Sequence, residues 1–180
     1  QPKGHTVNTI DAIYARRSVR AYQDRPVDPD TVETLLKAAM AAPTAVNTQP
    51  WEFIVTDDQS QIDKIKESCI YARYNAPLAF IVCGNMKMAL QGQDQELWVQ
   101  DCSAAIENVM LAATDLGIGS VWIVVYPIEP RVSELQSSFN MPEHVVPLSV
   151  VYVGYPDEET EPRTQYDEKR IHWHSYDQNR

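Results

Sequence analysis

One long, alanine-rich segment at residues 95–116 limits the possible folds more than any other part of the sequence. Its length and its apolar content predict a helix, and Gly117 stands where a left-handed C-terminal cap is expected. An apolar helix of this length has to be covered by other elements. We therefore expect it to be the central buried helix of one packed domain.

The rest of the chain is predicted to mix helices and strands. Asn8 or Thr9 caps a short helix, and Asp28 followed by Pro29 opens a second helix that stops before Pro43. Apolar patterns predict strands at 51–56, 78–83, 120–125 and 147–155, and helices at 59–67 and 130–138. No repeat or linker interrupts residues 1–180, so we expect a single domain. Residues 156–180 have too few apolar side chains for a core of their own.

Charge and hydropathy exclude several classes of partner. The chain has 15 Lys and Arg against 25 Asp and Glu, a net charge of −10, which argues against nucleic acid and anionic membranes as partners. Its apolar runs are far shorter than the roughly 20 residues that cross a bilayer. Residues 1–8 are polar and do not resemble a signal peptide, so we expect a cytoplasmic protein.

Cysteines and histidines give little support for a metal or disulfide site. Cys69, Cys83 and Cys102 are odd in number and widely spaced, which favours buried, reduced thiols. His172 and His174 have the spacing of one strand face, but no third ligand is indicated, so we predict no metal.

No hydrolase or metalloprotease motif supplies a catalytic residue. Asp101, near the start of the long helix, is interpreted as a helix-end or core-polar contact rather than as a base. We therefore assign no catalytic residue from the sequence.

Four of the nine arginines fall within ten residues of this acidic chain, at positions 16, 17, 20 and 25. Guanidinium groups match phosphate oxygens, and Ser18 adds a hydroxyl donor, so the segment suits a small phosphorylated ligand. The alternative is a surface charge run paired with the many acids.

A second segment, residues 42–51, is rich in turn formers and lies between a predicted helix and a predicted strand. Thr44, Asn47 and Gln49 can donate and accept hydrogen bonds, which suits the edge of a heteroaromatic ring. The alternative is a loop that satisfies only its own backbone.

Together these segments resemble the FMN-dependent nitroreductase family. The family's RRSxR-type stretch appears here at residues 16–20, and its A-P-[ST]-x-x-N-x-Q-P-W-x-F segment at residues 42–53. Residues 116–123 are similar to the family's LGLGSxWI pattern, and residues 151–156 to its VxxGYP strand end. The resemblance to the family extends over nearly the whole chain.

The resemblance implies the fold and the cofactor site. The expected fold is α+β with three layers, a mixed, mainly antiparallel sheet flanked by helices, in an intertwined homodimer whose residues 156–180 pack on the partner subunit. Arg16, Arg17, Ser18 and Arg20, helped by Lys169 and Arg170, would hold the FMN phosphate and ribityl chain. The loop would reach the flavin from the other subunit, through Pro43, Thr44, Ala45, Asn47 and Gln49. Backbone groups would face the reactive edge of the flavin at Ile123, Val124 and Val125.

The implied activity is ping-pong reduction of a nitroaromatic, quinone or similar acceptor, with NADH or NADPH as reductant. Reductive dehalogenation, flavin destruction to dimethylbenzimidazole, and non-catalytic FMN binding are the alternatives. Residues 84–98 correspond to the family's variable substrate lid. The candidates for substrate contact are Met86, Met88, Trp98, Tyr71 and Tyr74.

Overall fold

Two strands made almost wholly of apolar residues form the centre of a four-stranded sheet. The computed structural model describes residues 8–178, and its strands lie in the order β1-β2-β4-β3. They are β1 (Trp51–Thr56), β2 (Leu78–Asn85), β3 (Gly119–Val124) and β4 (Val145–Gly154). β2 and β4 each have a strand on both sides and helices over both faces, so almost all of their residues are buried.

The four-stranded sheet is antiparallel throughout, so of the predicted mixed, mainly antiparallel sheet the antiparallel part is confirmed and the mixed part is wrong. Every neighbouring pair of the four strands is antiparallel. The crossover through α4 (Leu97–Asp115) does return the chain in a parallel sense, because β2 and β3 run the same way, but β4 lies between them. Within residues 8–178, the parallel contact that remains is an isolated bridge between Ser18 and Ser120.

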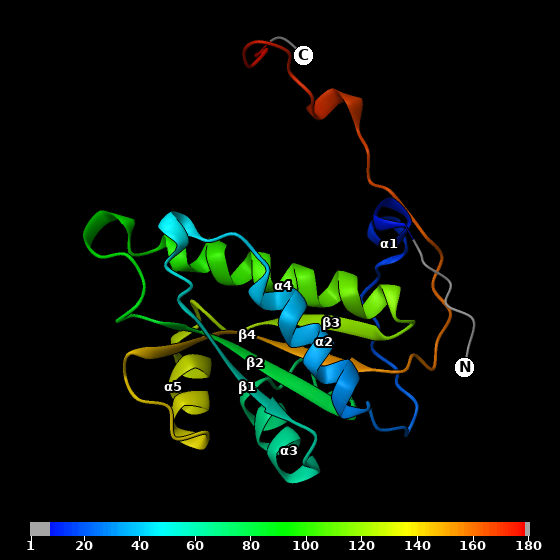
Figure 1. Ribbon diagram of the computed structural model, residues 1–180, viewed down its shortest axis with the longest axis vertical. Helices are drawn as coiled ribbons and strands as arrows, with labels where there is room; N and C mark the ends of the chain where they lie inside the picture. The colour runs from blue at the N-terminus through cyan, green and yellow to red at the C-terminus, as the bar shows by residue number, and fades with distance from the viewer. Residues whose placement is uncertain (1–7, 179–180) are drawn as a thin grey trace.

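Helices cover both faces of this sheet and make three layers (Figure 1). On one face lie α2 (Pro29–Met40) and α4 (Leu97–Asp115), and on the other lie α3 (Gln59–Ser68) and α5 (Glu129–Ser138). The short α1 (Thr9–Ala15) lies at one end of α4. This confirms the α+β class and the layered arrangement.

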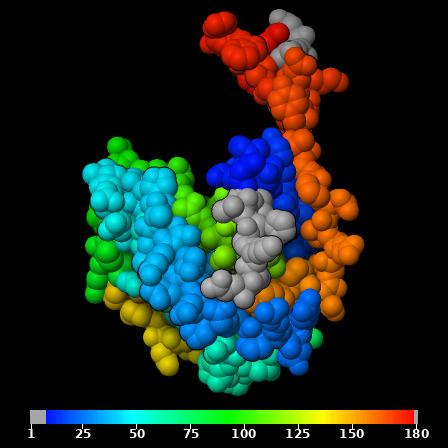
Figure 2. Space-filling view, turned by 45° about the vertical axis from the view of Figure 1, so that its right-hand side comes forward, coloured from blue at the N-terminus to red at the C-terminus, as the bar shows by residue number. Residues whose placement is uncertain are grey.

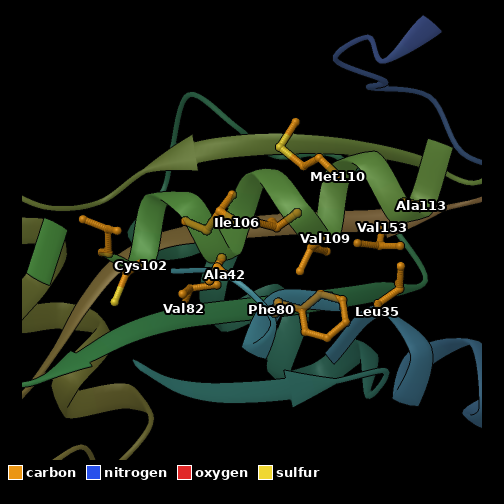
Figure 3. Packing of buried hydrophobic residues seen from close by; sticks show 14 of the residues in the cluster. Leu35, Ala42, Phe80, Val82, Cys102, Ile106, Val109, Met110, Ala113 and Val153 are labelled. Atoms are coloured by element: carbon orange, nitrogen blue, oxygen red, sulfur yellow. The ribbon is translucent and has the colours of Figure 1, made fainter. Parts of the chain in front are cut away.

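The alternation of side chains along the central strands divides the core into two clusters. Phe80 and Val82 of β2 pack with Ile106 and Val109 of α4 on one face (Figure 3). Ile81 and the other intervening residues of β2 point to the opposite face, against α3 and α5. Helix α4 is therefore buried along one side, as predicted for the central helix.

Local signals placed most helix ends correctly. The Asp28 side chain accepts a hydrogen bond from the Thr31 N–H at 2.9 Å, and Pro29 follows as the first helical residue. Asn8 caps α1 in the same way. Gly117 has a φ of 71°, the left-handed conformation expected after α4. The helix itself begins at Leu97, two residues later than predicted.

The C-terminal segment leaves the body of the domain after β4. Hydrogen bonds from Asp157 N to Ala21 O and from Arg163 N to Tyr14 O lay it antiparallel to residues 14–23. Beyond this the chain extends away from the domain as an arm (Figure 2), on which Trp173 and Tyr176 are more than three-quarters exposed.

Two expectations concern membranes and the chain start. Among residues 8–178, no helix has both the length and the apolar character that a bilayer crossing requires. The expected absence of a signal peptide concerns residues 1–8, which lie almost entirely outside the described residues.

The close approach of α4 to β2 can be tested at Gly84. A Cβ atom at this position would overlap the buried Trp98 ring and lie 2.9 Å from the Met86 methyl group. Gly84→Ala should therefore lower the free energy of unfolding by about 1–3 kcal/mol, measured by urea denaturation. Trp98→Leu should lower the free energy of unfolding less in the Gly84→Ala protein than it does in the parent, because it removes the ring that the new methyl group would overlap. Parent-like stability of Gly84→Ala would contradict this packing.

Candidate functional site

The arginine-rich segment lies along the edge of the sheet. Ser18 bridges Ser120 of the edge strand β3, and the Val19 N–H donates to the Ser120 carbonyl at 3.0 Å. Val19 is buried against Gly119, where a Cβ would meet its side chain at 2.8 Å. This close approach holds the segment on β3.

Alternate side chains of this segment face opposite sides, as in a strand. Arg16 reaches α4, where its Nε lies 3.5 Å from Glu107 Oε1. Arg17 turns the other way and donates from Nη1 to the Glu161 carbonyl of the C-terminal segment at 2.6 Å. The guanidinium of Arg17 is thereby separated from that of Arg16.

Arg17 and Arg20 form no salt bridge within the described residues. The contacts of the Arg17 and Arg20 guanidiniums are with carbonyls, of Glu161 and Ser18 respectively. Glu158 binds the backbone N–H groups of Arg20 and Ala21, and these hydrogen bonds lower the pKa of its carboxyl group, with a smaller contribution from the charge of Arg20. Fixed arginines that keep their charge suit a phosphate dianion.

The polar loop, residues 43–49, is held in an unusual backbone conformation. It contains a 3₁₀ turn at Ala45–Asn47, and Val46, Asn47 and Gln49 have φ values of 52°, 57° and 48°. Such left-handed residues other than glycine cost about 1–3 kcal/mol each, and Val46 is β-branched as well. The loop is therefore maintained by its surroundings rather than by local preference.

Two side-chain acceptors anchor the loop. Asp101 of α4 accepts the Ala45 N–H at 2.7 Å, and Thr44 Oγ1 accepts the Gln49 N–H at 3.1 Å. The first contact confirms that Asp101 is a core-polar group. A pocket of about 350 Å³ lies beside these anchors, lined by Pro43, Thr44, Ala45, Leu97, Gln100, Asp101 and Ala104.

The end of β3 is fixed by a bulge in its neighbour. Pro147 has no N–H to donate, and the pairing of β2 with β4 skips Leu148. The Leu148 carbonyl accepts the N–H groups of both Val125 and Tyr126. Arg131 of α5 donates to the Val124 carbonyl at 2.8 Å.

The contacts at the end of β3 determine which groups of residues 123–125 are exposed to a ligand. The Val124 side chain is half exposed and Ile123 is partly buried. Val125 is fully buried, and its N–H is occupied. Within one chain, Val125 therefore supports the strand end rather than presenting a group of its own.

The segments predicted to bind FMN do not meet within one chain. The loop is tied to α4 through Asp101, and Arg16 through Glu107, six residues later. In an ideal helix these positions are about 9 Å apart along the axis and about 120° apart around it. Lys169 and Arg170 belong to the 3₁₀ turn Glu168–Arg170, which lies on the projecting C-terminal arm (Figure 1), and Arg170 pairs with Asp167 at 3.3 Å.

The comparisons with known proteins agree on one family. The model described as "Nitroreductase family" matches residues 13–72 and 71–155. The chain belongs to the nitroreductase family. The sequence resemblance is thereby confirmed, and the family is one of FMN-dependent oxidoreductases that use NAD(P)H.

Similar proteins of this nitroreductase family occur in archaea and bacteria. An Archaeoglobus fulgidus protein named "Putative NADH dehydrogenase/NAD(P)H nitroreductase" is 46% identical over 91% of this chain and 95% of its own. A protein of the same name from Methanothermobacter thermautotrophicus is 43% identical over 92% of this chain and 86% of its own.

Solved structures show the same fold. A protein of that name from Parabacteroides distasonis has a TM-score of 0.88 and 36% identity, covering 94% of this chain and 99% of its own. The FMN-dependent nitroreductase of Clostridium difficile R20291 has a TM-score of 0.85 and 27% identity, covering 93% and 99%.

Buried hydroxyls reveal two polar residues that sequence reasoning missed. Within the described chain, the buried Oγ1 of Thr48 and Oγ of Ser120 have no hydrogen-bond partner. Thr48 belongs to the polar loop, and Ser120 pairs with Ser18. Buried hydroxyls usually have partners, so both segments suit a further polar group. Ser120 lies within the LGxGS pattern, which is the signal that could have found it.

The predicted substrate lid differs from expectation at its C-terminal end. Trp98 is only 2% exposed and packs in the core, so its assignment as a substrate contact is wrong. The Trp98 and Tyr126 rings pack edge to face with their centroids 5.0 Å apart, and the Tyr126 hydroxyl donates a hydrogen bond to Glu96 at 3.0 Å. Met88 and Tyr71 are exposed, whereas Met86 and Tyr74 pack against the core clusters.

The cysteine prediction is confirmed. Cys69, Cys83 and Cys102 are free and buried, and burial raises the pKa of Cys102 to about 12. A neutral, buried thiol is a poor nucleophile. His172 stacks on Tyr176, and no cluster of three or more His, Cys, Asp or Glu able to hold a metal occurs within residues 8–178.

The Arg16–Glu107 pair gives a test by pH. Burial raises the pKa of Glu107 above its ordinary value of 4.5, and Arg16 opposes this shift. Folding thus favours the protonated form of Glu107. The stability that Glu107 contributes is complete below the pKa that its carboxyl group has in the unfolded chain, and it is lost as the pH rises through the higher pKa of the folded protein. Glu107→Gln should flatten this slope and leave the protein at least as stable as the parent near neutral pH.

Urea denaturation between about pH 3.5 and about pH 7.5 measures this slope. Glu33→Gln is the control, because the pKa of Glu33 is lowered by Lys37, and its contribution is instead lost as the pH falls. A Glu107→Gln protein that is clearly less stable than the parent at neutral pH would show that the Arg16 ion pair outweighs burial.

Proposed function

We propose that this protein binds FMN along the edge strand β3 and uses it to oxidise NADH or NADPH and reduce an electron-poor acceptor such as a nitroaromatic or a quinone. The observation that carries the proposal is the bridge between Ser18 and Ser120. It sets the arginine-rich segment about 13 Å along β3 from Val124. A cofactor with a phosphate at one end and a ring at the other suits this spacing.

The chain's own groups would bind and orient this cofactor. When bound, FMN supplies the chemistry, accepting a hydride from NAD(P)H and passing electrons to the acceptor. Arg16, Ser18 and Arg20 would hold the phosphate, while Arg17 anchors the C-terminal segment. The β3 end, held by Arg131 and Leu148, would offer a fixed backbone edge and the half-exposed Val124 side chain to the ring.

No side-chain acid or base is required by this scheme. Hydride transfer depends on placing the nicotinamide and the acceptor in turn against the same ring face, which predicts ping-pong kinetics. The three free cysteines suit a reducing compartment, so we place the activity in the cytoplasm.

The dehalogenation alternative is less well supported by the lid. Binding an amino-acid zwitterion would call on an acidic side chain there, and the one that the dehalogenation alternative considered, Glu96, instead accepts a hydrogen bond from the Tyr126 hydroxyl. Halide release from iodotyrosine at a rate matching quinone reduction would favour dehalogenation over the proposed reaction.

The first test is direct. The purified protein should absorb in the visible range of a flavin, release FMN on heating, and bleach anaerobically with NADH or NADPH. If the flavin binds but neither nicotinamide reduces it faster than free FMN, the protein is a binding protein rather than a reductase.

The phosphate site gives a mutational prediction. Arg16→Ala combined with Arg20→Ala should raise the Kd for FMN at least tenfold, because each charged hydrogen bond contributes about 1.5–3 kcal/mol. Arg73→Ala, which removes an arginine bound to the Lys66 carbonyl on α3, is the control and should leave the Kd unchanged. Fluorescence titration measures both, and an unchanged Kd in the double variant would contradict the assignment.

We also propose a homodimer in which each polar loop, with Pro43, Thr44, Ala45, Asn47 and Gln49, meets the partner's cofactor. The separation of the loop from Arg16 around α4 supports this. So do the apolar side chains left about half exposed on α1, Ile10, Ile13 and Tyr14, and the exposed Trp173 of the arm. The arm would bring Lys169 and Arg170 to the partner.

Light scattering tests this assembly. The mass should be about twice 20.4 kDa, and Trp173→Ala should shift the equilibrium toward monomer. Ile70→Ala, at a half-exposed apolar residue that follows α3, is the matched control. A parent protein that stays monomeric at micromolar concentration would overturn the dimer.

A further inference from the structure

Asp101 is a buried carboxylate that the proposed reaction does not use. It lies in the second turn of α4 and is only 6% exposed. Among residues 8–178, no other Asp, Glu, Lys or Arg is buried to this degree. Carboxylates are rarely buried without a strong interaction, so this one calls for an explanation.

The interaction it makes is with the backbone of the polar loop. Its Oδ1 accepts the Ala45 N–H at 2.7 Å, within the short range of hydrogen bonds to charged acceptors. Ala45 is the first residue of the 3₁₀ turn, and its carbonyl accepts the Thr48 N–H at 3.1 Å. Asp101 therefore holds the residue from which the whole turn starts.

The turn needs such an anchor because its conformation is unfavourable by itself. Val46, Asn47 and Gln49 are all left-handed, and Val46 is 84% exposed, so no packing of its side chain holds it there. Backbone of this kind persists only where neighbouring contacts determine it. Asp101 supplies the contact at the start of the turn and Thr44 Oγ1 the contact at its end.

We propose that Asp101 is a positioning residue for this loop: its carboxylate fixes the turn in which Thr44, Asn47 and Gln49 are presented to the flavin. The identity of that ligand rests on the proposed function, whereas the ordering of the loop by Asp101 does not. The role requires an oxygen acceptor at this position rather than a charge against the ligand.

Three variants separate positioning from plain stability. Asp101→Ala removes the acceptor, and Asp101→Asn keeps an oxygen at nearly the same place. Asn108→Ala is the matched control, because Asn108 also lies on α4 and binds backbone, donating to the Ala38 carbonyl of α2 at 3.0 Å. Asn108 has no hydrogen bond to the loop among the contacts of the described residues.

Two readouts are needed, one without FMN. In the FMN-free protein, hydrogen exchange at the Ala45 amide should accelerate about tenfold or more in Asp101→Ala, since a charged hydrogen bond is lost. In the holoprotein, the Kd for FMN and the KM for the acceptor should rise about tenfold. Asp101→Asn should stay within about threefold of the parent in both readouts. Asn108→Ala should lower the Tm without changing the exchange rate of the Ala45 amide, the Kd for FMN or the KM for the acceptor.

Each opposite result overturns the proposal. Unchanged Ala45 exchange in Asp101→Ala would show that the hydrogen bond does not order the loop. If Asp101→Asn fails as badly as Asp101→Ala in FMN binding while its Ala45 amide stays protected, the role is a direct charge contact. A parent protein that binds no FMN would defeat the proposed function, yet the exchange measurement would still decide whether Asp101 orders the loop.

Discussion

The packing of α4 on the sheet is the constraint on which the rest of the structure depends. Ile106 and Val109 turn one side of this helix toward β2, and with the helix rotation fixed, every other side chain on it has a determined direction. Asp101 therefore meets the start of the polar loop, and Glu107 meets Arg16. A helix buried to satisfy the hydrophobic effect thus also places two carboxylates that organise the candidate site.

Much of the fold could be predicted from local signals. The Asp28 cap and the left-handed Gly117 mark helix ends, and the continuous apolar run at the start of β2 marks a central strand. The order of the strands could not be predicted, because a connecting helix shows neither how its two strands are oriented nor whether another strand lies between them. Helix α3 joins the antiparallel neighbours β1 and β2, whereas α4 joins β2 and β3, which run the same way on either side of β4. The insertion of β4 between β2 and β3 is a property of the whole sheet.

The candidate site was likewise predicted in part: its polar side chains were visible in the sequence, and the contacts that hold them were not. Side-chain chemistry pointed to the arginines and to the polar loop, but the supports of the site are backbone contacts that leave little trace in a sequence. The skipped Leu148 beside Pro147 directs a carbonyl to the end of β3, and Ser120 becomes a buried neighbour of Ser18 only once the two segments pair. Trp98 was misassigned because an aromatic residue at the end of a polar loop gives no sign that its ring is covered by the sheet.

The contact between Arg17 and the Glu161 carbonyl has a thermodynamic consequence. It joins the C-terminal segment to the same short stretch of chain that carries Arg16 and Ser18. Any ligand that orders this stretch also favours the docked C-terminal segment, and by linkage a docked segment favours the ligand by the same free energy. Occupancy of the site and docking of the C-terminal segment are therefore coupled equilibria.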